Sequence, residues 1–301
     1  MQRIVPNLWY DGAAEEAARR YVELIPGSRL GAVTRYGKAG REIHGQAEGS
    51  VMTQDFELAG TRVTALNGGP LFRFTPAISF FVTLDRREDV DRAWAGLAEG
   101  GEALMPLDAY PWSPRYGWVA DRWGMTWQIA QGDPAASGRA VAPLLMFTGA
   151  QAGRAESAIE EYVSLFAGSA ITGVARYDGS GPDAAGTVMH AQFTLGGETF
   201  MAFDSAGQHD FGFGEAVSLA VPRSGSLAGL TLAMSIWART SREKRLVGRL
   251  RRWTAAAGTP SGSMTSIIAG ERPSTRGSAG PECQTQRWTL RSASEVGLPS
   301  G

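Results

Sequence analysis

The sequence predicts an α+β protein that contains two copies of one domain, with elements in the order βαβββ. Three observations lead to this prediction. Similar segments recur at an offset of 137 to 141 positions. Segments with period-two hydrophobicity alternate with segments of helical periodicity. The length of 301 residues suits two domains, since a domain usually has about 150 residues.

The internal repeat keeps its order in both halves of the chain. The matching segments are residues 6–10 and 143–147, 21–24 and 162–165, 33–36 and 174–177, 49–52 and 186–189, 56–60 and 193–197, and 78–80 and 217–219. The match ends after residue 222, so the second copy is expected to be truncated. We predict a complete domain at 1–132, a linker at 133–140, a partial domain at 141–222 and a tail at 223–301.

The first unit is predicted to consist of a strand, a helix and three strands, at residues 4–10, 13–24, 31–36, 52–58 and 61–66. In the helix, Ala14, Ala17 and Tyr21 recur at helical spacing. Glu15 and Glu16 suit the positive end of the helix dipole. The last two strands show period-two hydrophobicity and are joined by a short turn, which predicts a hairpin.

The second unit repeats this order, at residues 77–84, 88–98, 102–107, 117–120 and 126–130. Its helix places Val90, Trp94 and Leu97 on one face. Asp121 and Gly124 take the positions that they favour in a type I turn. Units of this kind are expected to form two curved sheets that face a shared cleft.

The composition is that of an ordinary globular protein, with 43% hydrophobic and 20% charged residues. A single cysteine, Cys283, excludes an internal disulfide framework and a cysteine-based zinc site. No run of about 18 apolar residues predicts a membrane-spanning helix. The first residues lack the apolar core of a signal peptide, so we expect a cytoplasmic protein.

Charge divides the chain sharply near residue 222. Residues 1–222 carry 17 basic and 26 acidic side chains, whereas residues 223–301 carry 12 basic and 4 acidic ones. The acidic body argues against a nucleic acid or an anionic membrane as its partner. The tail has three interpretations: a disordered basic extension, a helix at 227–250 that covers the incomplete copy, or an out-of-frame translation, which is the hypothesis we favour.

Three motifs carry a resemblance to a known family: LWYDG followed by AEEA at residues 8–17, LNGGP at 66–70 and GWVADRWGMTWQ at 117–128. The chain resembles the vicinal oxygen chelate superfamily and, within it, the PhnB-like group that is called the 3-demethylubiquinone-9 3-methyltransferase domain. The resemblance covers residues 3–130 fully and 141–222 partly. It implies tandem vicinal-oxygen-chelate-type domains made of βαβββ modules.

The resemblance also implies a divalent metal held by His and Glu on the strands that face the cleft. The corresponding positions carry no His, Glu or Asp: Val5, Asn7, Val63, Ala65, Ala77, Ser79 and Gln128 in the first copy, and Ala142, Leu144, Phe200, Ala202, Ala216 and Ser218 in the second. His44, His190 and His209 do not have the spacing of a ligand set. The sequence also lacks the glycine-rich strand-to-helix turn that would indicate a nucleotide site. We therefore predict no metal and no cofactor, and no catalytic residue is assigned.

The sequence favours a protein that binds a small organic molecule in an aromatic-lined cleft. The candidate ligand-binding residues are Trp9, Asn67, Trp118 and Gln128. One alternative is a metal-dependent lyase, isomerase or dioxygenase of the same superfamily. Another is an interaction protein that acts through its basic tail. The two copies are expected to pair within one chain as a pseudo-dimer, or between chains as a homodimer.

Overall fold

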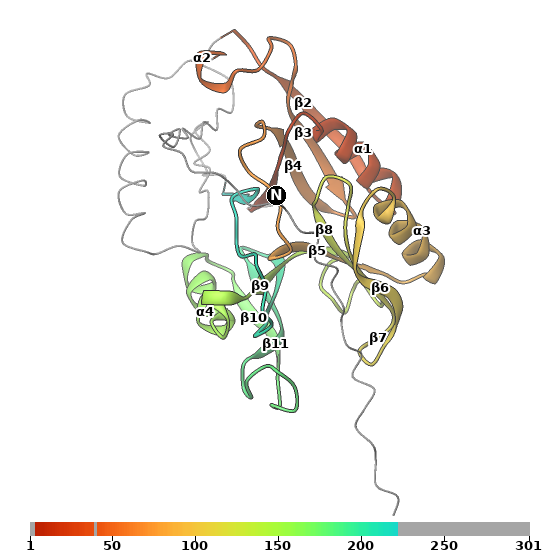
Figure 1. Ribbon diagram of the computed structural model, residues 1–301, viewed down its shortest axis with the longest axis vertical. Helices are drawn as coiled ribbons and strands as arrows, with labels where there is room; N and C mark the ends of the chain where they lie inside the picture. Colours follow the sequence, from red (N-terminus) through yellow and green to blue (C-terminus); the bar gives the residue numbers. More distant parts are fainter. Residues whose placement is uncertain (1–3, 39–40, 222–301) are drawn as a thin grey trace, which may run out of the picture. The chain divides into compact units, whose positions relative to one another are not determined.

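Two mixed β-sheets form the framework of the computed structural model, which describes residues 4–38 and 41–221 (Figure 1). All described residues belong to a single compact unit. The sequence predictions for the tail at 223–301 lie outside the described residues.

The described elements form three βαβββ modules and the first strand of a fourth. The first module comprises β1 (Val5–Tyr10), α1 (Ala14–Leu24), β2 (Arg29–Arg35), the four-residue α2 (Arg41–His44), β3 (Val51–Leu58) and β4 (Thr61–Asn67). The second comprises β5 (Ile78–Leu84), α3 (Arg87–Ala98), β6 (Glu102–Tyr110), β7 (Ser113–Ala120) and β8 (Thr126–Gln131). The third comprises β9 (Val141–Phe147), the 3₁₀ turn η1 (Gly149–Gln151), α4 (Ala155–Leu165), β10 (Ala170–Arg176), β11 (Val188–Leu195) and β12 (Glu198–Asp204), and β13 (Val217–Ala220) follows. The predicted α+β fold of βαβββ modules is confirmed.

The two sheets join modules from different copies. Sheet A has the strand order β13-β1-β4-β3-β2, and sheet B has the order β10-β11-β12-β9-β5-β8-β7-β6. Strands β1 and β13 pair antiparallel, as do β9 and β5, and the two pairs share one register. Ser218 lies opposite Asn7 just as Ser79 lies opposite Leu144. The first five strands of sheet B therefore repeat sheet A, and β8, β7 and β6 are added only to sheet B.

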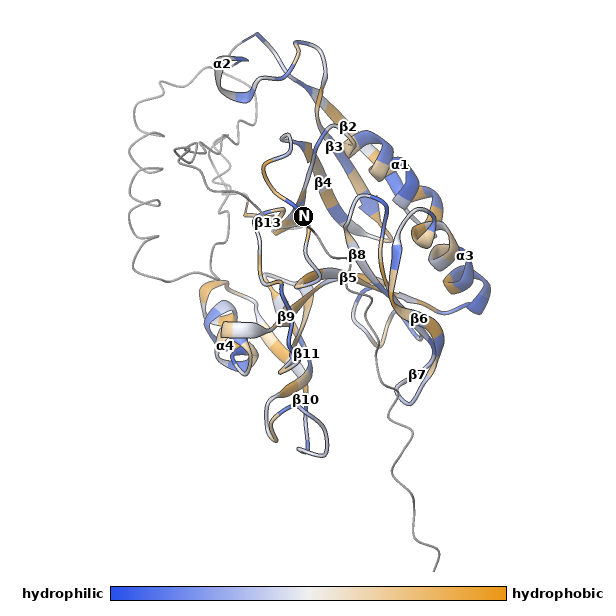
Figure 2. Ribbon diagram, in the orientation of Figure 1, coloured by the Kyte–Doolittle hydropathy of each residue, from blue (hydrophilic) through white to orange (hydrophobic). Residues whose placement is uncertain are grey.

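Helices cover one face of each sheet because alternate strand residues are apolar on that face. Phe80, Val82 and Trp127 of sheet B pack with Val90 and Leu97 of α3 in one core cluster. The same cluster contains the buried face of α1, and a second cluster joins α4 to β9, β11 and β12. Hydrophilic and hydrophobic bands alternate along α1 and α3, as expected of helices with one exposed face (Figure 2).

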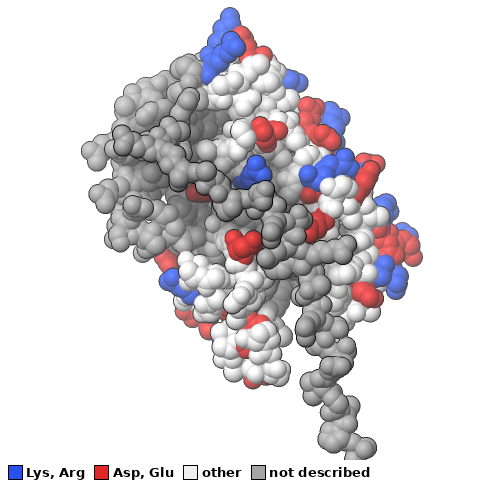
Figure 3. Space-filling model, viewed as in Figure 1, with Lys and Arg blue, Asp and Glu red and all other residues white. Residues whose placement is uncertain are grey.

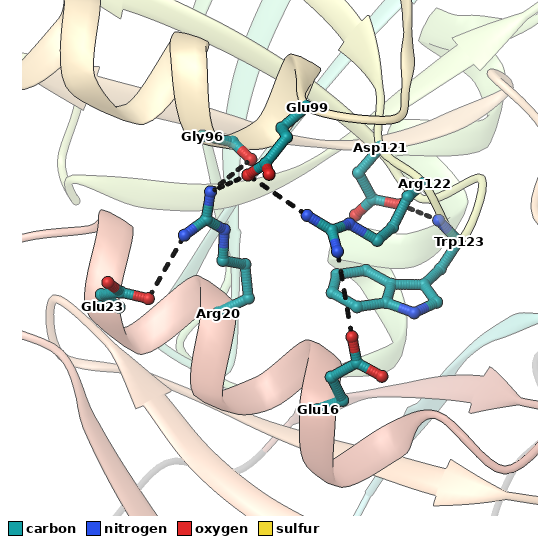
Figure 4. Close-up of polar contacts among 8 residues, drawn as sticks. All are labelled: Glu16, Arg20, Glu23, Gly96, Glu99, Asp121, Arg122 and Trp123. Carbon is teal, nitrogen blue, oxygen red and sulfur yellow. Dashed lines mark hydrogen bonds and ion pairs between the residues drawn. The ribbon is translucent and has the colours of Figure 1, made fainter.

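Helices α1 and α3 meet at a close contact. A Cβ atom on Gly96 would lie 2.2 Å from a terminal carbon of Leu24, so any larger residue at this position would displace the Leu24 side chain. Arg20 donates to Glu99 and to the Gly96 carbonyl oxygen, and Arg122 pairs with Glu99 and Glu16 (Figure 4). Basic and acidic side chains alternate over this region of the surface (Figure 3). Such exposed ion pairs add little stability compared with the apolar contact below them.

The largest differences from the sequence prediction occur in the β6–β7 hairpin. Both strands are longer than the predicted 102–107 and 117–120, and Tyr110 pairs with Ser113 across a two-residue turn. Register shifts interrupt this hairpin at three places. A bulge breaks the period-two pattern, so the pattern hid the ends of both strands. His44 ends the short helix α2.

Candidate ligand-binding face

The face of sheet B opposite α3 and α4 carries polar and aromatic side chains from several strands. We call it the ligand face and define it on the six inner strands, β11, β12, β9, β5, β8 and β7. Successive side chains on a strand point to opposite faces. The ligand face therefore carries the residues that alternate with those packed on the helices. It comprises His190, Gln192, Thr194, Thr199, Met201, Phe203, Ala142, Leu144, Met146, Ser79, Phe81, Thr83, Thr126, Gln128, Ala130, Tyr116, Trp118 and Ala120.

A row of hydrogen bonds crosses the centre of this face. The Tyr116 hydroxyl of β7 donates to Oε1 of Gln128 on β8 at 2.8 Å. Nε2 of Gln128 donates to Oγ of Ser79 on β5 at 3.1 Å. Burial raises the pKa of the Tyr116 hydroxyl far above its usual value, so this residue is a neutral donor near pH 7. The row fixes the orientation of the Gln128 amide and leaves the Ser79 hydroxyl free to donate.

Aromatic side chains from distant strands converge on the same face. The rings of Phe81 on β5 and His190 on β11 have centroids 6.4 Å apart, although two strands separate β5 from β11. In a flat sheet these strands would lie about 14 Å apart. The ring of Tyr116 lies 6.5 Å from Phe81 on the other side. The short distance between Phe81 and His190 indicates that sheet B curves towards the ligand face.

Two polar atoms of the ligand-face residues lack partners. Nε1 of Trp118 and Oγ1 of Thr83 are buried and have no hydrogen-bond partner among the described residues. A buried donor without a partner is unfavourable in a folded protein. Both atoms are able to bond to a polar group of a bound molecule.

The structure brings together two of the four candidate residues from the sequence. Trp118 and Gln128 are paired neighbours on β7 and β8. Trp9 lies instead in sheet A, where its Nε1 donates to the Gly69 carbonyl oxygen at 2.7 Å and its ring meets the edge of Phe72.

Asn67 also lies in sheet A, on the face that carries α1. Its Oδ1 accepts from the backbone N–H of Ala14 at 2.8 Å, and its Nδ2 donates to the carbonyl oxygen of Val51 at 3.0 Å. Asn67 therefore satisfies one of the unpaired N–H groups at the start of α1. Both ends of its amide are used within the protein.

Sequence reasoning missed Tyr116, Phe81 and His190 as members of this face. Tyr116 fell outside the predicted strand 117–120. Phe81 is alternate to Phe80 on β5, and that period-two signal was available. The proximity of His190 to Phe81 depends on sheet curvature and on the pairing of β5 with β9, which no local pattern shows.

The side chains of the ligand face do not fit a divalent metal. Divalent ions are held by imidazole, thiolate or carboxylate groups, and the only such group on this face is the His190 imidazole. Within the described part of the chain, no group of three or more His, Cys, Asp or Glu side chains has an arrangement able to hold a metal ion. His44 and His209 make local contacts, with the N–H of Gln46 and the hydroxyl of Ser205.

A buried carboxylate stabilises the turn that the sequence predicted at Asp121. The Gly124 N–H donates to the Asp121 carbonyl oxygen, which confirms the turn. The Asp121 carboxylate also accepts from Tyr21 at 2.6 Å, from Nε1 of Trp127 at 2.9 Å and from the N–H groups of Trp123 and Met125. Burial raises the pKa of this carboxyl, and the four hydrogen bonds oppose the rise. The group links α1 to the second module inside the helix-side core.

The described residues form βαβββ modules from both copies that share a curved sheet. The chain belongs to the family described as 3-demethylubiquinone-9 3-methyltransferase, whose family model matches residues 2–130 and 139–227. No match was found among curated proteins.

Several solved structures are similar to the chain. A PhnB protein from Bacillus cereus is 34% identical over 44% of this chain and 100% of its own, with a TM-score of 0.40. A protein from Pseudomonas aeruginosa is 24% identical over 44% of this chain and 98% of its own, with a TM-score of 0.37. Glyoxalase I from Zea mays is 10% identical over 72% of this chain and 74% of its own, with a TM-score of 0.46. No helix within residues 4–38 and 41–221 has the length and hydrophobicity to cross a membrane.

Proposed function

We propose that this protein binds a small organic molecule on the ligand face of sheet B, without a metal ion at that face. The hydrogen-bonded row from Tyr116 through Gln128 to Ser79 is the observation that carries this proposal. A pre-oriented polar row among apolar and aromatic side chains is typical of small-molecule sites.

Trp118 and Gln128 keep their predicted roles in this proposal. Nε1 of Trp118 supplies an unused donor, and the Ser79 hydroxyl supplies another. Trp9 and Asn67 are assigned to the packing of sheet A, because neither residue lies on the ligand face and their polar atoms bond to the backbone at Gly69, Ala14 and Val51.

The test is ligand screening by thermal shift, followed by isothermal titration of each compound that stabilises the protein. Replacing Gln128 with Leu removes both hydrogen bonds of the row and nearly keeps the side-chain volume. This substitution is expected to weaken binding about tenfold, since one hydrogen bond to the ligand contributes about 1–1.5 kcal/mol to the binding free energy. Trp9→Phe is the matched control in sheet A and is expected to leave the affinity unchanged.

Two results would overturn the proposal. The first is a Trp9→Phe variant that loses binding while Gln128→Leu retains it, because the ligand would then lie on sheet A. The second is near-stoichiometric nickel, zinc, manganese or iron in the purified protein, measured by plasma mass spectrometry after growth with added metals. That result would favour the metal-dependent enzyme, with His190 and His209 as the first residues to mutate.

A further inference from the structure

Strand β10 forms one edge of sheet B and is exposed along its whole length. Two apolar side chains of this strand, Ile171 and Val174, are each 41% exposed, and Met189 on the adjacent strand β11 is 47% exposed. The outer side of an edge strand presents backbone N–H and C=O groups that have no strand partner, and such an edge can pair with a strand of another chain. The β10 edge therefore has the properties of an interaction surface.

The other three edges of the described sheets carry features that oppose strand pairing. Strand β6 contains Pro106, which has no N–H group, and its ladder has three register shifts. Strand β13 has four residues. Strand β2 ends with Arg35, which donates to the Gly49 carbonyl oxygen and has no acidic partner within the described part of the chain. Short strands, prolines, bulges and exposed charges all protect an edge from pairing.

Strand β10 ends with the equivalent arginine, but there the charge is neutralised. Arg176, the counterpart of Arg35, donates two hydrogen bonds to the carboxylate of Glu156. The equivalent glutamate of the first copy, Glu15, pairs instead with Arg19 of its own helix. Residues 170–176 contain no proline and no other charged side chain. The β10 edge is therefore the least protected of the four.

The register of β10 indicates where a second strand can pair. Irregularities interrupt its ladder with β11 between Ile171 and Gly173 and again between Ala175 and Arg176. Residues 173–175 form a regular segment between these interruptions, with Val174 at its centre. When a segment pairs antiparallel with its own copy, a two-fold axis passes through the central position. The two Val174 side chains then lie directly opposite each other, and a pair of β-branched side chains is favourable at such a position.

We propose that two copies of this chain associate through antiparallel pairing of their β10 strands, about a two-fold axis at Val174. The pairing provides partners for backbone groups of the edge and removes Ile171 and Val174 from water. A second copy fits this edge because the one charge of the segment is already bound to Glu156, so the two strands meet without repulsion. The surface is separate from the ligand face, and the inference does not depend on the proposed function.

Sedimentation velocity of the full-length protein tests the association. A reversible equilibrium between monomer and dimer is expected within about 1 to 300 µM chain. Val174→Lys places two ammonium groups opposite each other and is expected to raise the dissociation constant of the dimer about tenfold or more. Val33→Lys is the matched control, because Val33 is the counterpart of Val174 on β2 and is equally exposed at 41%. This control is expected to leave the equilibrium unchanged.

Disulfide cross-linking locates the axis in the full chain. Replacing Cys283 with Ser removes the native thiol. In that background, Val174→Cys is expected to form a disulfide between two chains under mild oxidation. Directly opposite residues of antiparallel strands have Cα atoms about 4.5–5.5 Å apart, which suits a disulfide. Val33→Cys is expected to remain a thiol at the same protein concentration.

Three results would overturn the proposal. A protein that stays monomeric over the whole concentration range has no such contact. A dimer that is as stable in Val174→Lys as in the unchanged protein associates through another surface, which includes any contact made by residues 223–301. Equal cross-linking of Val174→Cys and Val33→Cys would show that the thiols meet by random collision.

Discussion

Helices α1 and α4 occupy equivalent places in the two copies, yet their surroundings differ. Leu24 of α1 is 5% exposed and packs against Gly96 of α3, whereas its counterpart Leu165 of α4 is 55% exposed. Residues 4–38 and 41–221 contain no counterpart of α3 beside α4. The comparison shows that α3, in the module that follows α1, buries the end of α1 that is left exposed on α4.

The sheets differ in the same way. Sheet A repeats five strands of sheet B with the same register, but within the described residues it has no strands equivalent to β6, β7 and β8. Two of those strands, β7 and β8, supply Tyr116, Trp118 and Gln128 to the ligand face. The difference therefore concerns the proposed site as well as stability.

The largest expected effect comes from the carboxylate that links α1 to the second module. Asp121→Ala leaves four donors without an acceptor, so we expect a loss of about 3–5 kcal/mol in the free energy of unfolding. Among the described residues, the Asp204 carboxylate in the second copy accepts from two groups, the N–H groups of Ala155 and Val188, and Asp204→Ala should cost less. Urea unfolding measures both values. Equal losses in the two variants would contradict the comparison.

The paired leucines provide the second test. Leu24→Ala creates a cavity between α1 and α3, and we expect a loss of about 2–4 kcal/mol. Leu165→Ala removes an exposed side chain and should cost about 0.5 kcal/mol or less. Thermal and urea unfolding of the two variants should rank them in this order. A large loss in Leu165→Ala would show that α4 is covered in the folded protein.

The residues at the starts of α1 and α4 provide a smaller effect. Asn67 donates to the Val51 carbonyl oxygen, whereas its counterpart Asp204 accepts from the Val188 N–H. Asn67→Asp places a carboxylate oxygen against a carbonyl oxygen, so we expect a loss of about 2 kcal/mol. The isosteric change Asn67→Leu, which lacks both hydrogen bonds, is a useful companion. Full stability of Asn67→Asp in urea would contradict the assigned amide orientation.

The smallest expected effect is a pH dependence of the free energy of unfolding that comes from His190 in the second copy. The counterpart of His190 is Thr53, which bonds to Thr34 and does not titrate. The folded state lowers the pKa of His190 below its unfolded value. The unfolded chain then binds more protons, so stability falls as the pH drops from about 6.5 through the folded pKa. His190→Asn should reduce this loss in unfolding midpoints between pH 7.5 and 5. An identical pH profile would show that His190 makes no contribution.

The sequence predicted the module order because periodicity is a local property. The helix at 13–24 and the strand at 126–130 differ from α1 and β8 by one residue each. The pairing of β5 with β9 could not be predicted from local sequence, because the register of strands that are distant in the chain depends on the whole core. The same limit applies to the site. Trp118 and Gln128 belonged to a recognisable motif, but His190 joins them only through the curvature of an eight-stranded sheet.

The junction between β8 and β9 has a consequence for how the ligand face is assembled. Strand β8 ends at Gln131 and β9 begins at Val141, so a short connection joins the two halves of sheet B within one chain. Association of covalently linked halves has an effective concentration that dilution does not change. Formation of this eight-stranded sheet is therefore independent of protein concentration. The binding capacity per chain should stay constant as the sample is diluted.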